Sequence, residues 1–266
     1  MADIRIVVNG ALGKMGQAIS GGLAQQPGLL IAAGVDAAAN DAAMLVPGTR
    51  AQVPLAKSVA ALPASFQADV LVDFSVAAAT MPAVRAAVQR KMHFVVGTTG
   101  LEAAWVEEMA ALAKQHQVGG AVIPNFALGA VLMMHLAQIA APHFDYAEII
   151  EMHHETKKDA PSGTADATAR MMAQARGKPF QRNVPEVERV KGARDAAVGG
   201  VTIHSVRLPG AMAHQEVIFG IAGQTLTIRH DTINRDCYVP GIALAVRHVV
   251  RHPSELVRSL EKLLGL

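Results

Sequence analysis

Cysteine and aromatic residues are scarce in this sequence. Cys237 is the single cysteine in 266 residues, which excludes a disulfide framework and a cysteine-based metal site. A chain with one thiol is typical of a reducing compartment, so we expect a cytoplasmic protein. Aromatic side chains make up only 4% of the sequence, and the core must therefore be built from Ala, Val, Leu, Ile and Met.

Clustered charge and long apolar runs are also missing. The formal net charge is +2 and the basic residues are scattered, which argues against a nucleic-acid-binding surface. The longest apolar stretch, Ala127–Pro142, is interrupted by His135 and Gln138 and is too short to span a bilayer. The start, Met1–Asn9, indicates a first strand rather than a signal peptide. We expect neither nucleic acid nor a membrane as a partner.

The first half instead has a regular alternation of short apolar runs and longer alanine-rich runs. The apolar runs predict strands at Ile4–Val8, Leu30–Val35, Val70–Phe74, His93–Val96 and Gly120–Ile123. The longer runs predict helices at Lys14–Gln25, Ala77–Arg90 and Leu101–Gln117. Strands that are apolar throughout are typical of a sheet covered by helices on both faces. This half therefore predicts an α/β fold with a Rossmann-type, doubly wound parallel sheet.

The second half has a different pattern. Helices are expected at Leu128–Ala141 and Ala165–Arg176, and strands at Ala147–His153, Val201–Leu208, Gln215–Ile221 and Thr225–Arg229. Consecutive strands without intervening helices predict a mostly antiparallel sheet and an α+β domain. The segment Gly177–Gly199 has no clear period, and loops of this length are usually functional or mobile. Leucines and a valine at helical spacing predict a helix in the tail, Ser254–Leu264.

Three glycines mark the turn from the first strand into the first helix. Gly10, Gly13 and Gly16 have the spacing G-x-x-G-x-x-G, which meets the general dinucleotide-binding pattern only loosely. Such a turn lets backbone N–H groups approach a pyrophosphate. Asp36 follows 20 residues after Gly16, where an acid would bind the adenosine ribose. The alternative is a tight turn without a ligand, and the strand context and the spaced acid favour the cofactor.

Three further loops follow predicted strands, at the sheet edge where ligands bind in open α/β folds. They are Asp73–Ser75, Gly97–Gly100 and Pro124–Phe126. The Gly-Thr-Thr-Gly sequence of the second loop offers backbone and hydroxyl groups to a carboxamide or a ribose. Read alone, it is equally consistent with an ordinary strand-to-helix turn.

The polar chemistry is concentrated in Glu151–Ala165. His153 and His154 end an apolar strand and would point to opposite faces if the strand stayed regular, so the backbone must leave the sheet there for both to serve one pocket. A histidine exchanges protons near neutral pH, and Lys157 can donate a proton or hold a carboxylate. Pro161–Thr164 opens a helix whose free N–H groups suit an anion. The combination indicates an anionic substrate beside a proton donor.

Each of these residues also has a simpler explanation. A histidine here can be structural, Lys157 and Lys158 can be solvated, and Ser162 can be only a helix cap. A metal site would need a third ligand that the segment does not show, and His-Glu-x-x-His is absent, so we predict no metal.

Together these motifs resemble the 4-hydroxy-tetrahydrodipicolinate reductase family, also called dihydrodipicolinate reductase. The most specific part is E-x-H-H-x-x-K-x-D-A-P-S-G-T-A, complete from Glu151 to Ala165. The opening G-A-x-G-K-M-G, the V-D-F-S run and G-T-T-G follow in the expected order, and the resemblance covers nearly the whole chain. Glu155 and Thr156 fill spacer positions that are often basic in relatives, which makes the local field less positive.

The resemblance implies reduction of 4-hydroxy-tetrahydrodipicolinate to tetrahydrodipicolinate with loss of water, in lysine (diaminopimelate) biosynthesis. It implies a dinucleotide-binding domain of residues 1–126 completed by 237–266, and a substrate-binding and tetramerisation domain of residues 127–236. His153 and Lys157 would be catalytic, and the substrate, a small dicarboxylate, would be bound by His154, Gly163 and Thr164. Cofactor contacts would come from Gly10, Ala11, Leu12, Gly13, Lys14, Met15, Asp36, Gly97, Thr98, Thr99, Ile123, Pro124, Asn125 and Phe126.

The residues also bear on the choice between NADH and NADPH. The Asp36 carboxylate suits an unmodified ribose, and no arginine follows it to bind a 2′-phosphate, although Lys14 in the glycine turn can reach one. We expect both cofactors to be used, with NADH favoured.

Two other functions are possible for such a sequence, a nicotinamide-binding redox sensor or regulatory subunit and another two-domain dehydrogenase. The intact histidine and lysine site argues against the sensor, and the lack of an activated cysteine near any motif argues against aldehyde oxidation.

Overall fold

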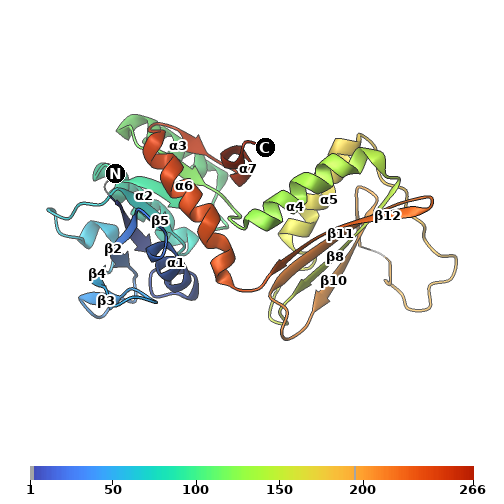
Figure 1. The fold of residues 1–266 in the computed structure, drawn as a ribbon, viewed down its shortest axis with the longest axis horizontal. Coiled ribbons are helices and arrows are strands. Elements are labelled where there is room, and N and C mark those ends of the chain that lie inside the picture. Colours follow the sequence, from blue (N-terminus) through green and yellow to red (C-terminus); the bar gives the residue numbers. More distant parts are fainter. Residues whose placement is uncertain (1–2, 195) are drawn as a thin grey trace. The chain divides into compact units, whose positions relative to one another are not determined.

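The computed structural model describes residues 3–194 and 196–266, and the chain divides into two compact units (Figure 1). The first unit combines residues up to 128 with residues 235–266, and the second spans residues 129–234. The boundaries expected from the sequence are 126/127 and 236/237. Residues 1–2, in the run Met1–Asn9, and residue 195, in the segment 177–199, lie outside the described residues.

The first unit is built on a twisted sheet whose strands are parallel except for one pair. The order is β13 (Leu256–Val257), β7 (Gly120–Val122), β6 (His93–Val96), β5 (Val70–Asp73), β1 (Ile4–Asn9), β2 (Leu29–Val35), β4 (Gln52–Ala56) and β3 (Ala43–Leu45). Only the edge pair β3–β4 is antiparallel among these described strands. The central strands are buried along nearly their whole length, because helices cover both faces.

The helices of the first unit form two layers. Helix α1 (Lys14–Ala24) packs with α6 (Val239–Arg251), and α2 (Ala77–Gln89) packs with α3 (Ala103–His116). Both α2 and α6 contact β5 and β6, from opposite faces of the sheet (Figure 1). This arrangement confirms the predicted doubly wound, Rossmann-type unit.

The second unit is a mixed sheet with helices on one face. Its order is β12 (Gln224–Thr232), β11 (Ala213–Ile221), β8 (Tyr146–His153), β10 (Val201–Arg207) and β9 (Ala197–Val198). Strands β8 and β10 are parallel and the other pairs are antiparallel, which agrees with the predicted mostly antiparallel sheet. Helices α4 (Leu128–Ala140) and α5 (Gly163–Arg176) contribute Met133 and Met172 to a core with Ile149 and Phe219 of the sheet.

The predicted continuous helix in the tail, Ser254–Leu264, is wrong. Leu256 and Val257 form β13, which pairs with β7, and only Leu260–Leu264 is helical, as α7. The sheet edge next to β7 accepts a strand, and this tertiary pairing overrides the local helical spacing. Short 3₁₀ turns lie at Val59–Ala61, Ala141–His143 and Arg235–Tyr238.

The sequence analysis assigned no element to α6 or β4, and proline explains both omissions. Helix α6 has Pro240 in its first turn, where the missing N–H would have had no helical partner. Strand β4 contains Pro54 and pairs with the edge strand β3. None of the helices in residues 3–194 and 196–266 is long and apolar enough to cross a membrane.

Candidate functional site

The glycine turn between β1 and α1 is shaped by close backbone contacts. Gly10 has φ +81°, and a Cβ there would lie 2.7 Å from the carbonyl oxygen of Phe74. A Cβ on Gly16 would collide with the carbonyl oxygen of Gly10. Among the described residues, no side chain caps α1 after Gly13, and its first turn has no acidic residue. The first N–H groups of α1 therefore suit a phosphate.

Asp36 follows β2 and holds the turn next to it. One carboxylate oxygen accepts the N–H of Leu12 at 3.1 Å and the other accepts the N–H of Ala38 at 3.0 Å. The acid predicted to bind a ribose thus already joins the glycine turn to the segment after β2. Its position is set by backbone groups and does not depend on a ligand.

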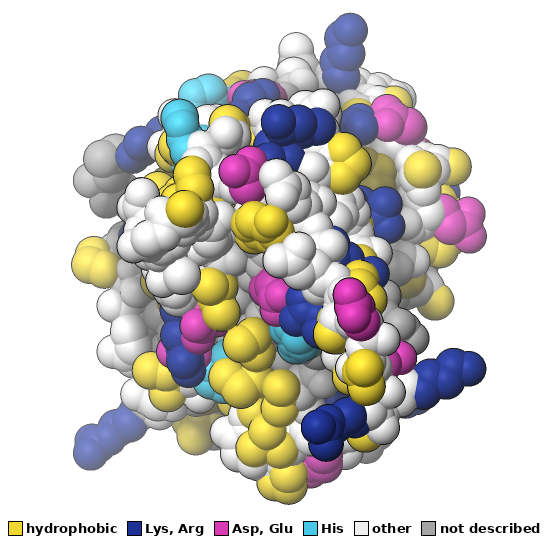
Figure 2. All heavy atoms as spheres, turned by 90° about the vertical axis from the view of Figure 1, so that its right-hand side faces the viewer, with side chains coloured by type: hydrophobic (Ala, Val, Ile, Leu, Met, Phe, Trp, Pro, Cys, Tyr) yellow, Lys and Arg dark blue, Asp and Glu magenta, His cyan; other side chains and the backbone are white. Residues whose placement is uncertain are grey.

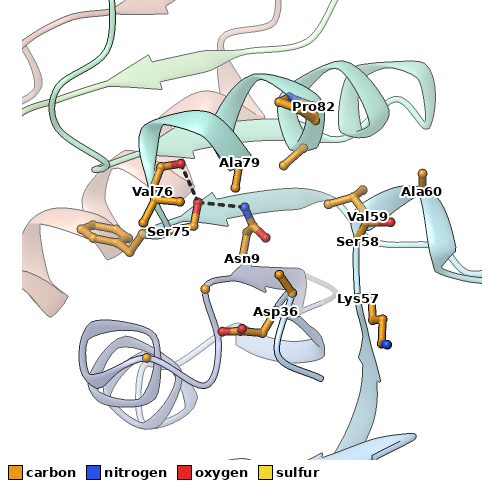
Figure 3. Close-up of a pocket in the computed structure, with 15 residues that line it drawn as sticks. Asn9, Asp36, Lys57, Ser58, Val59, Ala60, Ser75, Val76, Ala79 and Pro82 are labelled. Atoms are coloured by element: carbon orange, nitrogen blue, oxygen red, sulfur yellow. Dashed lines mark hydrogen bonds between the residues drawn. The ribbon is translucent and has the colours of Figure 1, made fainter. Parts of the chain in front are cut away.

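A cavity of about 500 Å³ opens at the carboxyl ends of β1, β2 and β5 (Figure 3). Strand β1 has β2 on one side and β5 on the other, which makes this the switch point where doubly wound sheets bind ligands. Gly10, Gly13 and Asp36, three of the residues predicted to contact a cofactor, line the cavity. Lys57, which was not among the residues predicted to contact the cofactor, also lines the cavity, on the side of Asp36.

Beneath these loops lies a buried carboxylate, Asp73, at the end of β5. It accepts hydrogen bonds from Asn9 Nδ2 (2.6 Å), Ser75 Oγ (2.6 Å), Thr80 Oγ1 (2.7 Å) and Thr98 Oγ1 (2.7 Å). These donors come from the end of β1, the loop after β5, helix α2 and the loop after β6. The hydroxyl of Thr98, expected to face the cofactor, is therefore used to hold the loop itself.

The remaining predicted cofactor residues occupy different positions. Lys14 is exposed and is not part of the cavity lining, Ala11 is buried, and Leu12 and Met15 are half-buried. In the later loops, Gly97 is half-buried, Ile123 is buried, and Thr99 and Pro124 are exposed. Asn125 Oδ1 accepts the N–H of Ala127 at 2.9 Å.

Phe126 is buried against Phe74, with ring centroids 5.7 Å apart. The loops after β5 and β7 are thus joined by an aromatic contact.

The second set of predicted residues lies at the end of β8 in the second unit. Strand β8 ends at His153 and a turn follows, in which the N–H of Lys157 donates to the carbonyl oxygen of His154 (3.1 Å). The Nδ1 atom of His154 lies 2.7 Å from Thr156 Oγ1. The backbone therefore leaves the sheet between the two histidines.

Glu151 is the centre of this site, and its side chain is fully buried. Arg207, at the end of β10, donates Nη1 to Oε2 (2.9 Å) and Nη2 to Oε1 (2.8 Å). His153 Nδ1 lies 2.6 Å from Oε2, and the N–H of Ser162 donates to Oε1 at 3.2 Å. A single carboxylate thus fixes the histidine, the arginine and the start of α5.

These contacts shift the pKa values of both partners. Burial opposes ionisation of Glu151, but hydrogen bonds from Arg207, Ser205 and His153 outweigh it, and the pKa of Glu151 falls below its ordinary value. Burial lowers the pKa of His153, and the hydrogen bond and charge of Glu151 only partly oppose this. Neutral His153 beside ionised Glu151 is therefore the favoured pair near neutral pH.

Arg207 also fixes the loop that carries Lys157. Its Nη2 donates to the carbonyl oxygen of Asp159 at 2.7 Å. The side chain of Asp159 in turn accepts from Lys157 Nζ at 2.7 Å. Arg207 was not among the predicted site residues, because its contact with Glu151 depends on the pairing of β10 with β8, which sets Arg207 opposite His153.

Helix α5 begins beside this cluster. Ser162 is its N-cap residue, and its Oγ accepts the N–H of Ala165 at 3.2 Å while its carbonyl oxygen accepts the N–H of Asp166 at 3.0 Å. Among the described residues, the N–H groups of Gly163 and Thr164 have no recorded protein acceptor. The helix start thus keeps two adjacent N–H donors for an anion.

The two halves of the chain match two family models. Residues 4–126 match the N-terminal dihydrodipicolinate reductase model, and residues 129–264 match the C-terminal one. A 4-hydroxy-tetrahydrodipicolinate reductase from Dehalococcoides mccartyi is 47% identical over 266 residues, which cover 100% of both chains. The protein of that name from Streptococcus pneumoniae is 43% identical and covers 98% of this chain and 100% of its own.

Solved structures are similar over the same length. The dipicolinate-bound dihydrodipicolinate reductase from Paenisporosarcina sp. TG-14 has a TM-score of 0.84 at 38% identity and covers 98% of this chain and 99% of its own. A probable dehydrogenase from Thermotoga maritima shares only the fold, with a TM-score of 0.63 at 14% identity, over 98% of this chain and 92% of its own. The full-length matches and the family models show that the chain belongs to the dihydrodipicolinate reductase family.

Proposed function

We propose that this protein reduces 4-hydroxy-tetrahydrodipicolinate to tetrahydrodipicolinate with loss of water, using NADH or NADPH, in lysine (diaminopimelate) biosynthesis. The observation that carries the proposal is the cluster of Glu151, His153 and Arg207 beside the start of α5. It joins a titratable histidine to an anion-binding helix end. The names of the relatives support the same reaction.

His153 is the proposed proton donor or acceptor, and Glu151 makes it fit for this role. When the carboxylate accepts a hydrogen bond from the protonated Nδ1, the ring is held in one tautomer. Its Nε2 atom then remains for the substrate. Lys157 is the proposed second proton donor. Its ammonium group is paired with the exposed Asp159, and the substrate carboxylate would compete for it.

A dicarboxylate substrate needs cationic and N–H partners. We assign its carboxylates to His154 and to the N–H groups of Gly163 and Thr164 at the start of α5, with Lys157 close in sequence. The solved relative from Paenisporosarcina was bound to dipicolinate, itself a dicarboxylate, which supports this class of substrate.

The cavity at the switch point fits a dinucleotide. Gly10 to Met15 would hold the pyrophosphate through backbone N–H groups, and Asp36 would bind the adenosine ribose. The predicted contacts from Gly97, Thr98, Thr99 and from Ile123 to Phe126 lie in loops at the same sheet edge. The bound nicotinamide supplies the hydride, and the protein's residues orient the partners and move the protons.

We further propose that both cofactors are used and that NADH is favoured. Asp36 disfavours a 2′-phosphate, while Lys57, which lines the cavity, and the exposed Lys14 favour it. An exposed lysine contributes about 1 kcal/mol or less, so neither reverses the preference. K57M and K14A should each lower catalytic efficiency with NADPH more than with NADH, by about fivefold at most. Equal losses with both cofactors would contradict this role for the lysines.

We propose a homotetramer assembled through the second unit. The face of its sheet opposite α4 and α5 carries Ile150, Met152 and Ile218, which are only half-buried in one chain. On the face of the molecule drawn in Figure 2, hydrophobic side chains also gather beside histidine and charged side chains. A sheet face of this kind favours association with another copy. A monomer in light scattering at micromolar concentration would contradict the proposal.

The test of the reaction is oxidation of reduced cofactor, followed by absorbance, with freshly generated hydroxy-tetrahydrodipicolinate. H153Q and K157A should each lower turnover by about two orders of magnitude while cofactor binding is kept, since each removes a proton donor. H154Q should act mainly on the KM for the substrate. Turnover near that of the wild type in both H153Q and K157A would refute the assignment, and no oxidation by the wild type would refute the reaction.

A further inference from the structure

Two histidines and a glutamate converge at the end of α6 in the first unit. His248 lies in the last turn of α6, His252 is its C-cap residue, and Glu255 precedes β13. One ligand atom of each residue lies within 4.8 Å of the others. Imidazole nitrogens and a carboxylate oxygen are the ligands that zinc and related divalent metals take in proteins.

The spacing of two of these atoms suits a shared metal ion. His248 Nε2 lies 3.4 Å from Glu255 Oε2. This nitrogen is buried, and among the described residues its polar neighbour is this carboxylate oxygen, at a distance too long for a well-formed hydrogen bond. Bond lengths of about 2.0–2.2 Å and a tetrahedral angle place two zinc ligands roughly 3.3–3.6 Å apart. The separation is longer than that of a usual N–H···O hydrogen bond, about 2.7–3.2 Å, and matches that of two ligands of one ion.

The third ligand and its surroundings fit the same interpretation. His252 Nδ1 lies 3.0 Å from the carbonyl oxygen of His248, and donation of its proton there leaves Nε2 with a free lone pair. Glu255 Oε1 is held by Lys262 Nζ at 2.6 Å, while Oε2 faces His248. A supporting contact such as that of Lys262 orients a carboxylate ligand in metal sites. The two imidazole rings are stacked with centroids 4.0 Å apart, so the exposed His252 has to turn its ring to point a lone pair at the ion.

We propose that His248, His252 and Glu255 form a binding site for a divalent transition-metal ion such as Zn²⁺, with water as the remaining ligand. The negative end of the α6 dipole favours a cation there, whereas Arg251 and Lys262 oppose it. The carbonyl oxygen of Glu255 accepts the N–H of Gly120 at the start of β7. The site therefore lies at the sheet edge opposite the cofactor cavity, and a bound ion stabilises the attachment of β13 to α6.

The experiment titrates the metal-free, full-length protein with ZnCl₂ by calorimetry and follows its unfolding temperature. The wild type is expected to bind one equivalent at this site and to unfold at a higher temperature with zinc. H252A and E255Q should each weaken this binding by about tenfold or more and remove the thermal effect. The matched control is H143A, which removes an exposed histidine from the second unit. It should bind zinc as the wild type does.

Two outcomes would overturn the site. One is a wild type that binds no zinc at protein concentration. The other is binding that persists in H252A and E255Q and is lost when His153 and His154 are replaced, because the metal would then sit at the substrate residues. Since the readouts are metal binding and thermal stability, they are independent of the proposed reductase activity.

Discussion

On each face of strand β8 a glutamate of that strand is bound by one arginine and one histidine. On the face toward α5, Glu151 is bound by Arg207 and His153, and its side chain is fully buried. On the opposite face, Glu148 is bound by Arg194 at 2.6 Å and by His204 at 2.7 Å, and its side chain is 36% exposed. The two glutamates are three residues apart, so the alternation of a strand sends them to opposite faces.

The difference between the trios is burial, and it changes what the charges do. In solvent, an ion pair such as Glu148–Arg194 contributes little to stability, because water screens it. When one partner of a buried pair is removed, the other is left charged without compensation, which costs far more. The same three residue types thus form a partly exposed contact on one face and a buried, fixed cluster on the other.

The largest expected effect comes from neutralising each glutamate in turn. E151Q should lower the free energy of unfolding by about 3 kcal/mol, because Arg207 loses its buried counter-charge. It should also lower turnover by about two orders of magnitude, the lower end of the scale for a lost proton-transfer group, because His153 loses the partner that orients it. E148Q, the matched control, should cost about 1 kcal/mol or less. Urea unfolding measures the change in stability, and the reductase assay measures the change in turnover. Equal effects of E151Q and E148Q would contradict the distinction between the two faces.

A smaller effect is expected in acid. The pKa of Glu151 is lowered in the folded protein, so its stabilisation is complete above its ordinary value of 4.5 and is lost as the pH falls toward the lowered value. Unfolding free energies measured from neutral to acid pH should therefore fall less steeply in E151Q than in the wild type. Hydrogen bonds from Arg194 and His204 lower the pKa of Glu148 as well, against its partial burial. The E148Q curve should still stay closer to that of the wild type, because water screens these partly exposed contacts. Parallel curves for E151Q and the wild type would contradict this.

The smallest effect concerns the titration of His153. Its pKa lies below the ordinary 6.5, chiefly because of burial, and the charge of Glu151 raises it toward that value. In E151Q the midpoint should therefore move lower still, and in E148Q it should not move. The Cε1–H resonance in a pH series measures this. An unchanged or higher midpoint in E151Q would show that Glu151 does not raise the pKa of His153.

Much of the fold follows from local pattern, and the exceptions have physical causes. The apolar runs of β1, β5 and β6 and the alanine-rich helices between them predict the first unit, because each strand is covered on both faces. Helix α6 was missed because Pro240 and Gly241 look like a break, and the tail was wrong because β13 forms only against β7. Pairing with a distant strand leaves no local signal.

The residues of the site also divide into those that a local sequence pattern predicts and those that it does not. The glycine turn and the run from Glu151 to Ala165 are continuous in sequence, so their chemistry can be predicted from spacing. Arg207 is 56 residues from its partner Glu151. Lys57 and Asp36 line the same cavity because the strands that they follow, β4 and β2, are paired. Such partners depend on strand register, which the sequence alone does not reveal.

The composition of the first unit from two separate stretches has a consequence for synthesis. The second unit is continuous, residues 129–234, and every strand of its sheet is available once β12 has left the ribosome. The first unit begins earlier but lacks α6, which covers β5, β6 and β7, until the second unit has been made. The nascent N-terminal sheet must therefore wait with part of one apolar face, over β5 to β7, uncovered. Ribosome-bound chains that stop before α6 are where chaperones would be needed most.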